Sequence, residues 1–199
     1  MNRSMLFATA FISALAVSAA ASAQTATGTI TINGSVAPKC AVTTGGSGGS
    51  FSETVELGEL AGANGTLLAS LGSTTAASPR FTSTFTLRCT GANVGVSVTA
   101  NPMLNTAGPA APAGYTKTIN LFGRAAIDLV GAGPTTLLVD DNSAVAGATV
   151  SAFGASNFLA NSANNIRVSA YGFNTAPNAA DILVAGSYIG TVVVVLTPA

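Results

Sequence analysis

The stretch QTATGTITINGSVAPKC, residues 24–40, alternates between apolar and polar side chains over nine of its residues. The residues on its apolar side are Gly28, Ile30, Ile32, Gly34 and Val36. A period of two predicts an extended strand with one buried face. Pro38 then removes a backbone donor and ends the strand, and Cys40 offers a covalent anchor two residues later. Function therefore depends on whether this apolar face is buried in its own domain or in a neighbour's.

Residues 1–23 have the features of an export signal. Arg3 gives a short basic start, an apolar stretch follows, and Ala21-Ser22-Ala23 forms a small-x-small cleavage site. We expect cleavage between Ala23 and Gln24, and contact with a membrane only during export. No second run of about 18 apolar residues follows the signal.

Seven Lys and Arg residues balance seven Asp and Glu residues, so the formal net charge is zero. Nothing basic enough to bind nucleic acid or anionic lipid is present. Only 7% of residues are charged, against the usual share of roughly a quarter. Two interpretations stay open: much of the surface contacts other subunits, or this is a poorly charged secreted protein.

The chain has two cysteines, and in an exported protein these are most simply one disulfide, Cys40–Cys89. The loop closed by this bond has about 50 residues, which stabilises the fold by roughly 4 kcal/mol in the chain-entropy model. Two free buried thiols are the alternative.

Short apolar runs separated by Gly, Pro and Asn indicate strands along the whole chain. Predicted strands cover residues 51–60, 81–89, 94–99, 119–122, 126–130, 135–139, 165–173 and 191–197. The second and third are separated by only four residues and are expected to form a hairpin. The last, TVVVVLT, predicts a strand that is buried on both faces or central to the core. No helical periodicity reaches ten residues, so the chain is predicted to be an all-β sandwich or barrel.

The composition argues against an enzyme. Without histidine, a Ser-His-Asp or Cys-His arrangement is impossible, and two cysteines cannot close a structural zinc site. Glu53, Glu56 and Glu59 are interpreted as solvated carboxylates, and Asp140-Asp141-Asn142 as a turn rather than a calcium loop. We expect no catalytic residues, no metal and no cofactor.

Several motifs, taken in order, resemble those of one family. The motifs that carry the resemblance are, in order, TGTITINGSVAPKCAV, VELGEL, FTLRCTG, IDL, YGF and GSYIGT followed by VVVVLT. In these motifs the chain resembles the archaic chaperone–usher pilins and the related spore coat protein U-like domain. The similarity spans residues 24–199. Two departures are Gly190, where the family often has Asp, and the Pro198-Ala199 end in place of an aromatic residue.

The resemblance implies an immunoglobulin-like, pilin-type sandwich that lacks its last strand, over residues 38–199. A periplasmic chaperone would first supply that strand, and residues 24–37 of an identical or related subunit would then replace it as donor strand at an outer-membrane usher. Gly28, Ile30, Ile32, Gly34 and Val36 would be the donor-strand anchors. The terminal core strand would present Tyr188, Val192, Val194 and Leu196. The implied function is a structural subunit of a surface fimbria that supports adhesion or biofilm formation, located in the periplasm in transit and then on the cell surface.

Two alternatives on the same fold stay open. One is an adhesive tip or carbohydrate-binding module, which is disfavoured by the lack of Trp and by only three Tyr residues. The other is a secreted coat or matrix protein that does not polymerise by strand exchange.

Overall fold

The computed structural model describes residues 28–199, except for the side chain of Ser47. The chain divides into two compact units, residues 1–35 and Val36–Ala199. Within the first unit, residues 28–35 form no helix or strand and are exposed. The predicted export signal and its cleavage site at Ala23 and Gln24 lie outside the described residues. No helix within residues 28–199 is long and apolar enough to cross a membrane.

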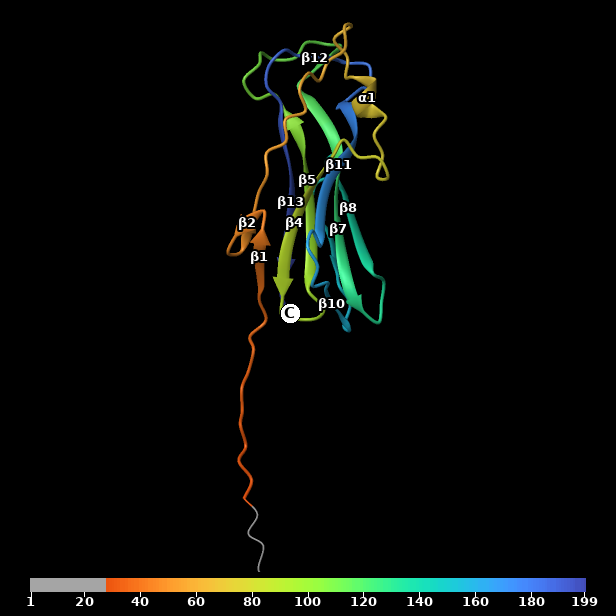
Figure 1. Cartoon of the computed structure of the whole chain (residues 1–199). Helices are drawn as coiled ribbons and strands as arrows, with labels where there is room; N and C mark the ends of the chain where they lie inside the picture. The colour runs from red at the N-terminus through yellow and green to blue at the C-terminus, as the bar shows by residue number, and fades with distance from the viewer. Residues whose placement is uncertain (1–27) are drawn as a thin grey trace, which may run out of the picture. The chain divides into compact units, whose positions relative to one another are not determined.

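The second unit is built almost entirely of strands (Figure 1). They are β1 (Cys40–Thr44), β2 (Gly46–Ser47), β3 (Ser50–Phe51), β4 (Phe81–Cys89), β5 (Gly95–Leu104), β6 (Tyr115–Thr116), β7 (Thr118–Gly131), β8 (Thr136–Asn142), β9 (Thr149–Ala152), β10 (Asn157–Leu159), β11 (Ile166–Ala176), β12 (Ile182–Leu183) and β13 (Ile189–Thr197). A single helical turn, α1 (Ala69–Gly72), lies between β3 and β4.

The strands form an antiparallel sandwich-like arrangement, which confirms the predicted all-β class. One layer has the order β1-β4-β11-β7, and β8 pairs with the far edge of β7. In the other layer, β5 pairs with β13 along one edge and with β9 along the other. The layers join where Met103 of β5 pairs with Ile119 of β7.

The core lies between these two layers because each strand turns alternate side chains inward. Its fully buried members include Val98 from β5, Ile119 and Ile127 from β7, and Ile166 from β11. Leu71 of α1 belongs to a second apolar cluster, together with Ile119 and Phe173. Val192 of β13 packs against both clusters.

The predicted hairpin between residues 81–89 and 94–99 is wrong. β4 pairs with β1 and β11, whereas β5 pairs with β13, β9 and β7. Phe85 and Leu87 of β4 nevertheless share a buried cluster with Val96 and Val98 of β5. The short connection therefore crosses from one layer to the other, so the two strands face each other across the core instead of pairing edge to edge.

Two further predictions fail around β7 and β8. Gly123 does not separate two strands, because β7 continues through it for 14 residues. Residues 140–142 belong to β8 and do not form a turn. Asp141 is buried, and its carboxylate accepts hydrogen bonds from the backbone N–H of Ala100 and the hydroxyl of Thr149, both at 2.8 Å. This carboxylate thus joins β8 to the opposite layer.

Candidate functional site: a groove beside the terminal strand

The segment of residues 52–60 follows β3 and forms no helix or strand. The prediction of a strand over residues 51–60 is therefore wrong except at Phe51, which belongs to β3. Val55, Leu57 and Leu60 are half-buried, and Leu57 and Leu60 pack against the core. The segment has the apolar side chains of a strand but no neighbouring strand to pair with in the described chain.

The terminal strand β13 is an edge strand. Within residues 28–199 its strand partner is β5, along one edge only. Val192, Val194 and Leu196 are half-buried and pack against the core, whereas Val193 and Val195 on the other face are 45% and 49% exposed. The prediction of a central strand, or one buried on both faces, is therefore wrong. The apolar run reflects one core-facing side and one exposed side.

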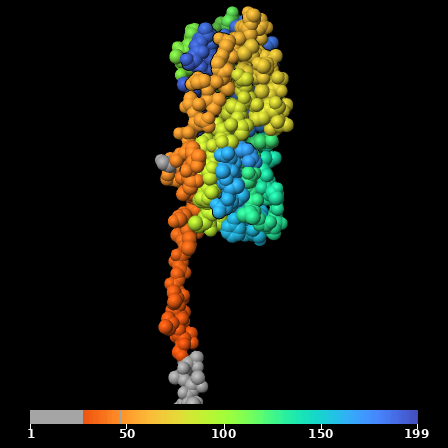
Figure 2. Space-filling view, in the orientation of Figure 1, coloured from red at the N-terminus to blue at the C-terminus, as the bar shows by residue number. Residues whose placement is uncertain are grey.

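A groove of about 1190 Å³ separates the segment of residues 51–61 from β13 and the residues before it. Figure 2 shows this segment, in orange, along one side of the body. Core residues from both layers line the groove: Phe81, Phe85, Met103, Leu121, Val168 and Phe173. The interior of the sandwich is therefore accessible from this side.

A smaller cavity of about 270 Å³ continues the groove toward the C-terminus. It is lined by β1 and by Val194, Leu196 and Pro198, and it shares Phe51 and Val194 with the larger groove. The ring of Phe51 packs on that of Phe85 with centroids 4.5 Å apart. Together the two cavities follow the chain from Leu183 to Pro198, a length that accommodates a strand of nine residues, about 30 Å.

Tyr188, predicted as part of the terminal core strand, lies just before β13 and lines the groove. Its hydroxyl donates to the carbonyl oxygens of Val184, at 2.8 Å, and Thr116, at 3.1 Å. Burial raises the pKa of this phenol, so Tyr188 remains a neutral donor. The residues that line the groove carry three exposed carboxylates, Glu53, Glu56 and Glu59, and no basic side chain.

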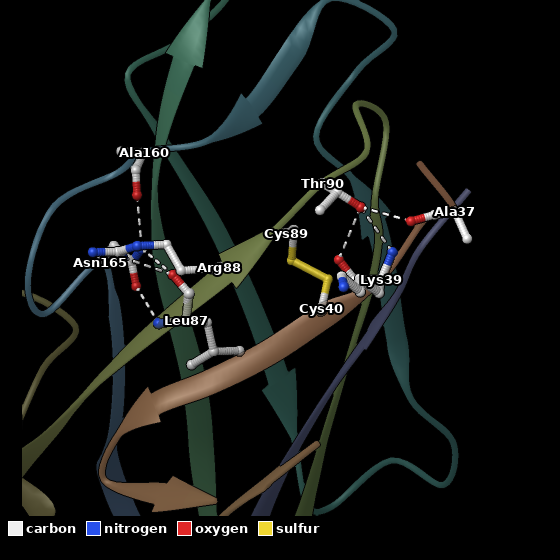
Figure 3. The surroundings of a disulfide bond; sticks show 9 residues. All are labelled: Ala37, Lys39, Cys40, Leu87, Arg88, Cys89, Thr90, Ala160 and Asn165. Atoms are coloured by element: carbon white, nitrogen blue, oxygen red, sulfur yellow. Dashed lines mark hydrogen bonds between the residues drawn. A yellow bond between two sulfur atoms is a disulfide. The ribbon is translucent and has the colours of Figure 1, made fainter. Parts of the chain in front are cut away.

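The predicted disulfide between Cys40 and Cys89 is confirmed, and it links β1 to β4 (Figure 3). Beside it, the hydroxyl of Thr90 donates to the carbonyl oxygen of Ala37, and the backbone N–H of Lys39 donates to the Thr90 hydroxyl. Cys40 and Pro198 both line the smaller cavity. The chain therefore enters the body at the end of the groove that lies beside the C-terminus.

The predicted donor-strand anchors are described on both sides of the boundary between the two units. Gly28, Ile30, Ile32 and Gly34 lie in the first unit, where Ile30 and Ile32 are 89% and 91% exposed. Val36 begins the second unit and is also exposed. None of the five belongs to a strand in this single chain.

The resemblance implied a sandwich that lacks a strand, but the pattern of the residues did not place the groove between residues 51–61 and β13. The apolar positions of residues 51–60 signalled a strand, but no pattern in one sequence reveals that a strand lacks its neighbour. Within residues 28–199, no group of three or more His, Cys, Asp or Glu side chains is placed to hold a metal ion.

A scan against protein-family models, a search of curated proteins and a search of solved structures each found no match.

Proposed function

We propose that this protein is the structural subunit of a surface fibre, in which the groove of one copy receives the strand Gly28–Val36 of another. The observation that carries this proposal is the groove between the unpaired segment of residues 51–61 and the free edge of β13. An accessible core and an unpaired strand edge are both unfavourable in water. A strand laid into the groove would remove both.

Residues 28–36, once extended as a strand, would have the composition that this groove requires. Its alternation presents Ile30, Ile32 and Val36 on one face, and each contributes about 1.5–3 kcal/mol when fully buried. Gly34 brings no side chain, so it would fit where the groove is shallow. The other face of the strand is Thr, Asn and Ser and tolerates solvent.

Backbone pairing adds to this apolar contact. Among the described residues, 28–199, β13 leaves one edge free and residues 52–60 have no ladder partner. An inserted strand can therefore bond to β13 on one side and approach residues 52–60 on the other. Strand addition of this kind takes its affinity from main-chain hydrogen bonds and its specificity from alternate side chains.

The position of the tether favours an open chain of subunits. The donor segment enters its own body beside Cys40, at the smaller cavity, whereas the large groove extends past Tyr188 toward Leu183. A donor that enters its neighbour from the Tyr188 end links the subunits head to tail. Such a heterologous contact generates a filament when the rotation between neighbouring subunits does not close into a ring.

The proposal includes the partners implied by the resemblance to archaic chaperone–usher pilins and spore coat protein U-like domains. A periplasmic chaperone would fill the groove before assembly, and an outer-membrane usher would exchange that strand for Gly28–Val36. The assembled fibre would lie on the cell surface and support adhesion or biofilm formation. The subunit itself would perform no catalysis.

Two adjacent substitutions test the proposal. Ile32→Asp places an unpaired charge in the apolar groove, which costs several kcal/mol, so cells should accumulate soluble chaperone-bound subunit and lack fibres in electron micrographs. Thr31→Asp, on the opposite face, is the matched control and should leave fibres intact. Loss of the chaperone-bound subunit in Ile32→Asp would instead assign the strand to its own core. Normal fibres with Ile32→Asp would overturn the donor assignment.

A further inference from the structure

The outward face of the layer formed by β13, β5 and β9 carries no charged residue. Cross-strand register places Val193 beside Thr99, and Val195 beside Ser97, which pairs with Val150 on its other side. Directly paired residues share one face of a sheet. We call this set of outward residues, together with Ile189, Thr191 and Asn101 at one end, the neutral face. None of the 23 residues in the three strands is Asp, Glu, Lys or Arg.

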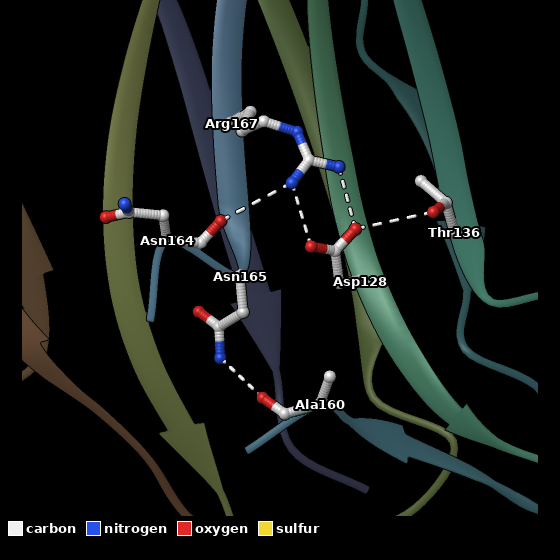
Figure 4. A network of polar contacts seen from close by, with 6 residues as sticks. All are labelled: Asp128, Thr136, Ala160, Asn164, Asn165 and Arg167. Atoms are coloured by element: carbon white, nitrogen blue, oxygen red, sulfur yellow. Dashed lines mark hydrogen bonds and ion pairs between the residues drawn. The ribbon is translucent and has the colours of Figure 1, made fainter. Parts of the chain in front are cut away.

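The opposite layer has a different outer surface. Arg124 pairs with Asp140 at 2.7 Å, and Arg167 pairs with Asp128 at 2.7 Å (Figure 4). The hydroxyl of Tyr171 also donates to Asp140, at 2.8 Å. The charged cross-strand pairs therefore lie on one side of the sandwich, and the other side is neutral.

The neutral face is also apolar where it is most exposed. Ile189 and Val150 are each 74% exposed, and Val193 and Val195 are close to half exposed. The cores of protein interfaces are depleted of charged residues, and burying a charge without a partner is costly. Two copies of this face can meet without burying any charge, and a two-fold axis places each strand against its own counterpart.

We propose that the neutral face is a contact surface between two copies of this protein, beside the groove that Ile189, Thr191 and Val193 also line. β5 and β13 are about 30 Å long and β9, with four residues, is about 13 Å long, so at about 4.8 Å per strand the face covers roughly 350 Å² per copy. The pair then buries about 700 Å², which is below the roughly 1,200 Å² of a stable complex. The contact is therefore weak between single subunits and becomes effective when many copies are aligned in a fibre.

Insertion of a donor strand, as in the proposed function, would widen the neutral face. A strand Gly28–Val36 that pairs with β13 would turn Thr29, Thr31 and Ser35 to the same side. These side chains are uncharged, so the neutral face would extend over four strands. The two-copy contact itself rests on β13, β5 and β9 and does not require strand exchange.

Single-cysteine cross-linking of the full-length protein tests the contact. Thr99→Cys places a thiol at the middle of the neutral face, and Leu138→Cys places one on β8, in the opposite layer. The two native cysteines are bonded, and no other cysteine is present. A short bismaleimide should link two copies through Cys at position 99 and give little product at position 138. Equal yields at both positions, or none at 99, would overturn the proposal.

Charged substitutions on the neutral face provide a second test of the contact. Val193→Lys, added to Thr99→Cys, should lower the cross-linking yield by roughly tenfold or more. Val150→Lys, on the mostly exposed strand β9, should act in the same direction with less risk to the core. Unchanged yields in both would also overturn the contact.

A background of Ile32→Asp separates this inference from the proposed function. Because the contact is weak between single subunits, Ile32→Asp should lower the cross-links at position 99 together with the fibres, and this result supports both proposals. Fibres that form normally without cross-links at position 99 eliminate the neutral-face contact alone. If the protein with native Ile32 forms cross-links at position 99 but no fibres, the strand-exchange function alone is eliminated.

Discussion

Val192 of β13 packs directly over Gly123 of β7. A Cβ atom at position 123 would lie 2.8 Å from Cγ1 and 2.9 Å from Cγ2 of Val192. β-Branched side chains have little freedom at χ1, so Val192 could make room only by moving β13. Gly123 therefore sets how closely the strand beside the groove approaches the opposite layer.

The first prediction follows from this contact. Gly123→Ala should lower the free energy of unfolding by about 1–3 kcal/mol, since it overpacks the interior. Gly95→Ala is the matched control, because its new methyl group would meet Thr197 at an ordinary 3.7 Å. Thermal unfolding of both variants in the same assembly state checks this prediction, and equal melting temperatures would contradict it.

The disulfide between Cys40 and Cys89 should make a large contribution to stability. The bond spans 49 residues of sequence and should contribute roughly 2–4 kcal/mol by restricting the unfolded chain. Paired Cys40→Ser and Cys89→Ser substitutions should lower the free energy of unfolding by that amount, as measured from the midpoint and slope of urea unfolding. Alkylation of the native, unreduced protein should modify no thiol, and two modified cysteines would contradict the bond.

Acid should weaken the pair formed by Asp128 and Arg167. The hydrogen bond from Arg167 lowers the pKa of Asp128, so the folded carboxyl has a lower pKa than the unfolded one, near 3.9. The pair's stabilisation is therefore present above about pH 4 and is lost as the pH falls through the folded pKa. Both side chains are about a third exposed, so the contribution is at most about 1 kcal/mol.

Arg167→Ala checks this dependence by urea unfolding at several pH values. Its loss of stability below pH 4 should be smaller than that of the unsubstituted protein. Arg88→Ala is the control, because Arg88 donates to the backbone carbonyls of Leu87 and Ser162 instead of a carboxylate. An identical acid profile for Arg167→Ala and the unsubstituted protein would contradict the assignment.

A polar bridge near the disulfide should be essential for folding. Asn165 is fully buried, and its amide group accepts from the N–H of Leu87 and donates to the carbonyl oxygens of Leu87 and Ala160, at 2.7–2.9 Å. Asn165→Leu should lose all three bonds, at about 1–3 kcal/mol for each buried group left without a partner. We expect the Asn165→Leu protein to give a lower soluble yield than the control Asn178→Ala, because Asn178 is exposed.

The strands that could be predicted from sequence are those whose neighbours are present in the same chain. The alternation from Phe81 to Cys89 matches β4 from end to end, because its inward side chains all meet one core. Residues 165–173 likewise predicted most of β11. In each case one period-two pattern specifies one buried face.

Pairing and position within the sheet could not be predicted. The apolar run TVVVVLT indicated a central strand. The hydrophobicity of a strand's side chains depends on what its two faces contact, and it gives no information on whether its edges are hydrogen-bonded to other strands. Residues 51–60 indicated a strand for the same reason. In the proposed assembly, the partner that both require comes from another subunit, as the resemblance implied, but the pattern of the residues alone did not place it beside these two segments.

Photo-cross-linking from position 32 measures the central claim most directly. A photoreactive amino acid at position 32 is incorporated into fibres that contain isotopically heavy and light subunits, and position 31 serves as the control. We expect mixed heavy–light peptides that link position 32 to residues 51–61 or 188–196, with far fewer from position 31. Links from position 32 only within one chain, or equally from both positions, would contradict it.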